Sequence, residues 1–163
     1  MKDNEIIICF KHTIEKDKPL IKRINASLVK FWTKSKYYHV EMVYKNKLIS
    51  SDTKSGVHIL DEFELNKEYY DLFKIQIPEL TDYQNEVFWK FLESEKETGY
   101  DWLGIFLSQF LFLDNESEDK WFCSEIVSKV LQLLYCKDFI GIKPSKNSPE
   151  DIFKILKEKL IKI

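Results

Sequence analysis

The chain has 163 residues, of which 44% are hydrophobic and 15% aromatic, a composition that excludes a disordered polypeptide. A chain of this length buries roughly two thirds of its unfolded surface on folding. Charged residues make up 32% and nearly balance, for a net charge of −2, and the basic residues are spread along the chain. We therefore expect one domain over residues 1–163 that does not bind nucleic acid.

The cysteine content and the apolar stretches indicate a cellular compartment. Cys9, Cys123 and Cys136 are odd in number and form no C-x-x-C pair, which argues against a disulfide framework and a structural zinc site and favours the reducing cytoplasm. The amino-terminal apolar run is too short for a signal peptide. The most apolar stretch, Trp102–Leu113, has twelve residues, whereas a membrane span needs about twenty. No transmembrane segment is expected.

The sequence predicts mainly strands in the first half of the chain. A short β-branched run over 4–10 predicts a buried strand with Cys9 in the core. Apolar residues at three- and four-residue spacing over 19–35 predict a helix or two short helical turns. Alternation over 37–52, with a tight turn at 45–47, predicts a β-hairpin. Further strands are expected over 56–60 and 69–77, the last ended by Pro78.

The sequence predicts mainly helices in the second half of the chain. One helix is expected to begin after Thr81 as its N-cap and to end at Gly99. Another is expected after Ser148, with Pro149 at its first position. The closing stretch 154–163, KILKEKLIKI, is locally basic, and we expect it to be a helix with a solvated face.

A third helix places a thiol at its start, in the stretch KWFCSEIVSKVLQLL. Its buried face is predicted by apolar residues at helical spacing: Ile126, Val127, Val130, Leu131 and Leu134. Cys123 then lies in the first turn, where unpaired N–H groups and the positive end of the helix dipole favour a thiolate. Cys123 is thus a candidate nucleophile. The alternative is a core thiol buried by Trp121 and Phe122.

A thiol nucleophile needs a base, and His39 is the candidate among the three histidines. Glu41 lies two residues further along the same expected strand, so both side chains share one face, and the carboxylate could orient the imidazole. Asp52, Ser50 and Ser51, across the hairpin, are other candidates for that role. The alternative is that Glu41 merely solvates an exposed strand face.

The segments YYHVEMVY, SGVHIL, GYDWLGIF, WFCSEIVSKVL and SPEDIFKIL occur in an order that resembles the YiiX-type permuted papain-like amidases. This branch of the NlpC-type cysteine hydrolases has members in bacteria, phages and poxviruses, and the likeness spans nearly the whole chain. It implies an α+β, circularly permuted papain-like fold, in which a small antiparallel sheet packs against helices and the cysteine lies at a helix N-terminus. Many relatives have a glycine–aspartate pair before the first strand, where this chain has Asp3–Asn4.

The resemblance also implies roles for individual residues. Cys123 matches the nucleophile and His39 the base, and Tyr100 matches a tyrosine whose hydroxyl helps to hold the oxyanion. Glu41 is the first choice for the orienting acid and Asp52 the second. The implied enzyme is a thiol amidase or peptidase that needs no metal or cofactor. It would cleave an amide or ester bond in a small peptide, an acylated amino acid or a lipid amide, through an acyl-enzyme.

Two other functions fit the same resemblance. One is a peptidoglycan peptide endopeptidase of phage origin, and the other is a catalytically silent binding or virion scaffold, which would make the protein virion-associated.

The segment Trp102–Leu113 is more apolar than a helix with one buried stripe needs. Burial in the core is one expectation. A homodimer face is another, and a third is an acyl-chain groove beside Cys123, since the related lecithin:retinol acyltransferases handle acyl chains on this fold.

Overall fold

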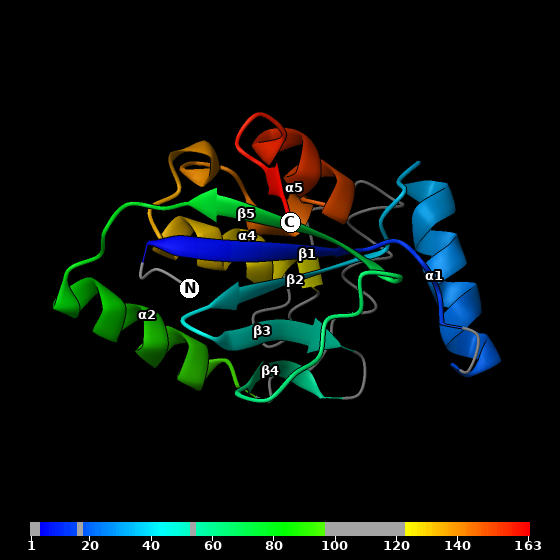
Figure 1. Cartoon of the computed structure of the whole chain (residues 1–163), viewed down its shortest axis with the longest axis horizontal. Coiled ribbons are helices and arrows are strands. Elements are labelled where there is room, and N and C mark those ends of the chain that lie inside the picture. Colours follow the sequence, from blue (N-terminus) through cyan, green and yellow to red (C-terminus); the bar gives the residue numbers. More distant parts are fainter. Residues whose placement is uncertain (1–3, 16–17, 53–54, 97–122) are drawn as a thin grey trace.

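The protein has an α+β architecture built on one antiparallel sheet of six strands (Figure 1). The computed structural model describes residues 4–15, 18–52, 55–96 and 123–163. The strand order is β4-β3-β2-β1-β5-β6, and every neighbouring pair is antiparallel. The strands are β1 (Glu5–Lys11), β2 (His39–Tyr44), β3 (Lys47–Asp52), β4 (Gly56–Leu60), β5 (Tyr70–Gln76) and β6 (Ile161–Lys162).

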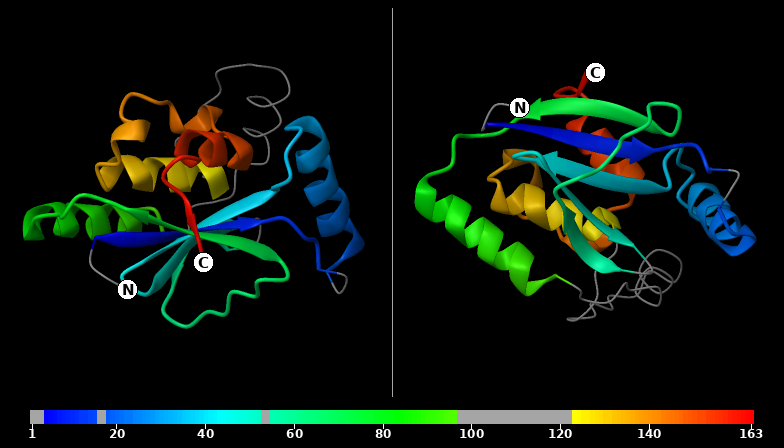
Figure 2. Two further views of the ribbon diagram at one scale, coloured as in Figure 1. Left: turned by 45° about the horizontal axis from the view of Figure 1, so that its top comes forward. Right: turned by 60° about the horizontal axis from the view of Figure 1, so that its bottom comes forward.

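The helices of the described residues lie on one face and around the edges of this sheet. They are α1 (Leu20–Trp32), α2 (Asp82–Ser94), α4 (Cys123–Leu133) and α5 (Pro149–Leu156), with short 3-10 helices η2 (Lys137–Phe139) and η3 (Pro144–Lys146). Helices α4 and α5 cover one face, whereas α1 stands off the end of the sheet where β1 finishes and β2 begins (Figure 2). Capping boxes start α2 and α5, which confirms the predicted N-caps Thr81 and Ser148.

The β2–β3 hairpin sets the register of the strand that carries His39. Its turn residues Lys45 and Asn46 have φ of 47° and 61°, the left-handed values that a tight two-residue hairpin turn requires. Tyr44 therefore pairs with Lys47 on the next strand. The predicted hairpin is confirmed. Because side chains alternate along a strand, this register also decides which residues of β2 share a face.

The sheet buries apolar side chains on both faces. The larger core lies between the sheet and the helices, where Ile8, Phe10 and Met42 pack with α4 residues such as Ile126 and Leu131. A smaller cluster on the other face consists of Cys9, Val43, Leu48 and Leu72. The prediction of a core position for Cys9 is confirmed, since it is fully buried. All three cysteines are free.

Two expected helix ends are wrong. Helix α2 ends at Ser94 with Glu95 as its C-cap, before Gly99. The closing stretch 154–163 is not one helix, because α5 ends at Leu156 and Ile161–Lys162 forms β6. That strand pairs with β5, where Lys74 lies opposite Ile161. The physical reason is that the edge of β5 offers unpaired backbone groups to any chain passing beside it.

Several expectations fall outside the described residues. They concern Tyr100, the aromatic pair Trp121 and Phe122, and the segment Trp102–Leu113 with its core, groove and dimer alternatives. Within the described residues, no helix has the length and apolarity that crossing a membrane requires.

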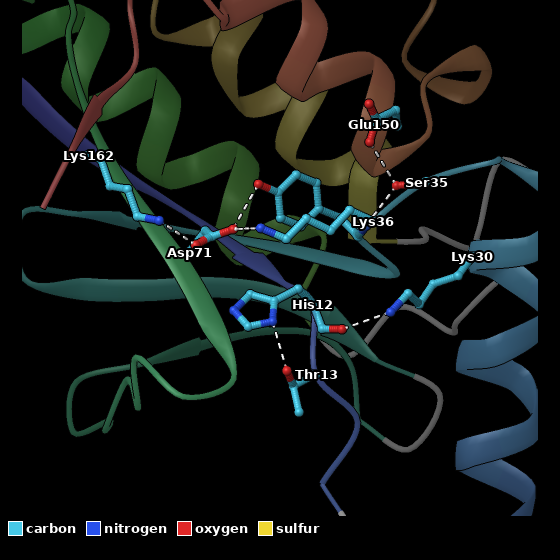
Figure 3. Close-up of polar contacts among 9 residues, drawn as sticks. His12, Thr13, Lys30, Ser35, Lys36, Asp71, Glu150 and Lys162 are labelled. Carbon is cyan, nitrogen blue, oxygen red and sulfur yellow. Dashed lines mark hydrogen bonds and ion pairs between the residues drawn. The ribbon is translucent and has the colours of Figure 1, made fainter.

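The segment that leads into β2 is held by a polar cluster around Asp71 (Figure 3). The buried Asp71 carboxylate accepts hydrogen bonds from Tyr37 Oη at 2.9 Å, from Lys162 Nζ at 2.8 Å and from Lys36 Nζ at 2.5 Å. Burial alone would raise the pKa of Asp71, but the hydrogen bonds from Lys162, Lys36 and Tyr37 hold it well below its usual range. Ser35 Oγ donates to Glu150 of α5 at 3.0 Å. The entry to β2 is thereby fixed on two sides.

We expect Asp71→Asn to lower the free energy of unfolding at neutral pH by about 1–3 kcal/mol, the value of charged hydrogen bonds to a buried group. Because folding lowers the pKa of Asp71, its contribution is present above the unfolded value near 3.9 and is lost as the pH falls. Chemical denaturation of both proteins should therefore give curves that converge below about pH 4.

Asp61→Asn is the matched control, since Asp61 pairs with Lys47 at the surface and its side chain is 76% exposed. It should change stability little. An Asp71→Asn protein as stable as the wild type at neutral pH would contradict the anchoring role.

Candidate active site

The first residues of β2 bring an imidazole and a carboxylate together. His39 lies opposite Lys11 of β1, and Glu41 lies opposite Cys9. As their two-residue spacing predicts, the two side chains share one face of the strand, and His39 Nε2 is 2.9 Å from Glu41 Oε1. Glu41 is only 8% exposed. The carboxylate is therefore a buried partner that fixes the imidazole ring rather than a solvated surface group.

Ser50 of β3 supports this pair from the neighbouring strand. Its hydroxyl donates to Glu41 Oε1 at 3.0 Å and lies 3.3 Å from His39 Nε2. Ser50 is fully buried. One carboxylate oxygen thus receives hydrogen bonds from both the imidazole and the hydroxyl, which restricts its rotation and so the orientation of the ring.

Cys123 is the first residue of α4, and its thiol meets the imidazole of His39 through a hydrogen bond. The backbone N–H groups of Val40 and Ser124 also donate to the sulfur. Cys123 is 4% exposed and belongs to the larger core, so α4 is packed firmly beneath the reactive atom.

The charges of these three groups depend on one another. Burial would raise the pKa of Cys123, but the charge and hydrogen bond of His39, with the N–H groups of Val40 and Ser124, lower it below its usual value. Burial would lower the pKa of His39, but Cys123 and then Glu41 raise it to about 10. Burial would likewise raise the pKa of Glu41, but His39 and Ser50 lower it to about 2. These shifts favour the ion pair of a thiolate and an imidazolium over the neutral pair, with an ionised Glu41 behind it.

The other side of Glu41 is enclosed by the sheet. Its Oε2 atom is buried. Tyr70 of β5 lies nearby, and burial together with the negative charge of Glu41 raises its pKa. Lys11 carries a compensating charge, with its Nζ 4.9 Å from the centre of the Tyr70 ring. This surrounding keeps water away from the carboxylate and strengthens its attraction for His39.

Asp52, His12 and His58 make contacts of their own. Asp52 Oδ1 accepts the backbone N–H of Ser55 at 2.9 Å, in the connection between β3 and β4. The carboxylate that accepts the hydrogen bond of the His39 ring is that of Glu41. His12 contacts Thr13, and His58 contacts the carbonyl of Gly56. Tyr100 lies outside the described residues.

Two contributors to the site were not assigned these roles from the sequence. The Val40 N–H is a backbone group, so only the packing of α4 against β2 reveals it. Ser50 was one of several candidates across the hairpin, and its contact with Glu41 follows once the Tyr44–Lys47 pairing is known. The register of the turn was the signal that could have singled it out.

No family model, curated protein or solved structure was found that matches this chain. Among the described residues, no group of three or more His, Cys, Asp or Glu side chains is arranged to hold a metal ion. The chemistry of the site is therefore inferred from its own geometry.

We expect iodoacetamide at about pH 6.5 to alkylate Cys123 at least about tenfold faster than Cys136, because the thiolate is the reactive form. Cys136 is a matched comparison, since it is 6% exposed, close to the 4% of Cys123. Burial and then the charge of Asp138 raise the pKa of Cys136 to about 11. Mass spectrometry of tryptic peptides gives both rates in one sample.

His39→Ala should remove most of the advantage of Cys123 while leaving Cys136 unchanged. Burial and the charge of Glu41 also raise the pKa of Cys9, so it should react slowly throughout. Equal labelling of the three cysteines in the wild type would show that Cys123 is an ordinary thiol.

Proposed function

We propose that the chain is a thiol hydrolase that cleaves an amide or ester bond through an acyl-enzyme, with Cys123 as nucleophile, His39 as base and Glu41 as orienting acid. One observation carries the proposal: a single imidazole is hydrogen-bonded to both a thiol at a helix start and a buried carboxylate. This is the arrangement that thiol nucleophiles use in unrelated enzymes.

The reaction would follow from these contacts. His39 holds the thiol proton, and the Cys123 sulfur attacks the carbonyl carbon of the substrate. The tetrahedral intermediate then collapses, the C–N or C–O bond breaks, and the imidazolium gives its proton to the leaving group. Water, deprotonated by His39, attacks the thioester and releases the carboxylic acid and the free thiol. Glu41 keeps the ring in the orientation that both proton transfers need.

The oxyanion of the intermediate needs donors that are in place beforehand. The N–H of Cys123, at the first position of α4, has no acceptor within its own helix. The resemblance to the YiiX-type amidases assigns the second donor to the hydroxyl of Tyr100.

The same resemblance supports a circularly permuted papain-like fold. The strand that carries His39 precedes the helix that carries Cys123, and the helix packs against an antiparallel sheet. The proposed substrates are small peptides, acylated amino acids or lipid amides. The three free cysteines fit a reducing, cytoplasmic setting.

The acyl-enzyme is the intermediate that tests the proposal. The protein is incubated with activated acyl esters, peptide pools and lipid-amide pools, and intact-mass and peptide mass spectrometry locate any adduct. We expect a thioester on Cys123 that disappears with time as water releases it. Cys123→Ala should form no adduct, and Cys136→Ala should behave like the wild type.

An adduct that forms but does not turn over, or no adduct with any acyl donor, would favour the silent scaffold of the same fold. Reaction with peptidoglycan peptides alone would favour the phage-type endopeptidase.

We expect Glu41→Gln to lower kcat/KM by about 10- to 100-fold, because the neutral amide orients the imidazole less well and does not stabilise its charge. Activity requires the Cys123 thiolate and the His39 imidazolium, so it rises through the lowered pKa of the thiol and falls as the pH passes about 10. Since Glu41 helps to raise the pKa of His39, the falling limb should move to lower pH in the variant.

Asp52→Asn is the matched control, a carboxylate-to-amide change at a residue that holds the β3–β4 connection. It should leave the pH profile in place and cost far less activity. A larger loss from Asp52→Asn than from Glu41→Gln would move the orienting role across the hairpin.

A further inference from the structure

Helix α1 turns an apolar stripe toward solvent. Leu20, Ile24, Leu28 and Phe31 follow one another at four- and three-residue spacing, so they lie on one face of the helix. Their exposed fractions are 69%, 45%, 47% and 75%. Ala26, six positions after Leu20 and on the other side of the helix, is buried. An amphipathic helix ordinarily buries its apolar stripe, whereas α1 presents it outward.

The stripe borders an open hollow of about 480 Å³. The hollow is lined by the same four apolar side chains, by Ile14 from the segment after β1, and by Arg23 and Ser27 of α1. In both orientations of Figure 2 the helix stands away from the layer formed by the sheet and α4. The apolar surface is therefore reachable by a large partner rather than enclosed.

The charge of this region differs from that of the rest of the chain. Residues 18–39 include six Lys or Arg residues and no Asp or Glu, whereas the rest of the chain has nineteen basic and 27 acidic residues. Arg23 and Lys34 are exposed. Lys18 pairs with Glu15 and Lys36 with Asp71, so Arg23 and Lys34 carry the exposed positive charge that a partner can meet. A partner that accepts large apolar side chains and carries negative charge next to them matches both features.

We propose that α1 is a docking helix for an anionic lipid bilayer, lying in the membrane interface with its apolar stripe among the acyl chains. An anionic bilayer combines the two properties, because acyl chains cover the apolar side chains and headgroup phosphates meet the lysine and arginine side chains. The phosphates of a nucleic acid would pair with the lysine and arginine side chains, but a nucleic acid would not cover four large apolar side chains. A second copy of the positive helix would bring like charges together.

The docking helix is tied to the end of the sheet that carries the candidate active site. Lys30 Nζ donates to the carbonyl of His12 at 2.9 Å, which attaches α1 to the segment after β1 (Figure 3). Helix α1 ends at Trp32, and β2 begins at His39. A bilayer on α1 therefore lies near the dyad. The docking proposal stands without the hydrolase proposal; combined with it, and resting on it, docking selects lipid amides or acyl lipids as the substrate class.

Vesicle flotation tests the docking surface with the chain of 163 residues. The probes are vesicles of phosphatidylcholine alone and of about three parts phosphatidylcholine to one part phosphatidylglycerol. We expect binding to the anionic vesicles, weakened by salt. Phe31→Ser and Leu20→Ser should each lower the affinity about tenfold, since each removes a large buried side chain from the lipid. Arg23→Gln should weaken binding to anionic vesicles only.

Ile140→Ser is the matched control, because Ile140 is 66% exposed and follows η2 rather than belonging to α1. It should bind like the wild type, and circular dichroism checks that every variant is folded. Cys123→Ser should also bind like the wild type, so lipid docking and hydrolysis can fail separately. Four results would each overturn the proposal. The first is an equal loss of vesicle affinity in Ile140→Ser, and the second is equal binding to neutral and anionic vesicles. The others are a dimer in light scattering that Phe31→Ser dissociates, and retention on heparin without vesicle binding.

Discussion

The imidazole of His39, held between the buried carboxylate of Glu41 and the thiol of Cys123, is the interaction on which the rest of the site depends. Burying a carboxylate and a thiolate is costly unless each has a partner, and His39 is the partner of both. His39 is the first of the groups that lower the pKa of both Glu41 and Cys123. This explains why the strand that bears His39 is fixed at both ends, by the β2–β3 turn on one side and by the Asp71 cluster on the other.

Local patterns predicted the parts of this arrangement that depend on neighbours in sequence. Two-residue alternation placed His39 and Glu41 on one face, and the tight turn at Lys45–Asn46 predicted the hairpin. The N–H of Val40 beside the sulfur could not be predicted, because it depends on where α4 packs against β2. The strand at Ile161–Lys162 was not predicted for the same reason. The residue spacing of 154–163 is a local feature that favours a helix, whereas pairing with β5 depends on a segment distant in the sequence.

Helix α1 shows a different limit of sequence patterns. The spacing of its apolar residues predicted helical structure, and α1 is a helix over Leu20–Trp32. The usual inference that such a stripe faces the core does not hold, since Leu20 and Phe31 are largely exposed. Periodicity identifies which face of a helix is apolar, but it does not identify the partner that covers this face. The charge distribution around the helix is the additional information that favours a bilayer over a protein core.

The position of α1 in the chain links these two features. It is inserted between β1 and β2, which are adjacent in the sheet, so both of its connections leave from the same end of the sheet. Backbone and side-chain contacts of Tyr38 with Lys11 and Thr13, each 3.1 Å long, join the two connections next to His39. The Asp71 cluster and the Ser35–Glu150 contact hold the segment between α1 and β2 against β5 and α5, so the position of His39 is fixed independently of what covers α1.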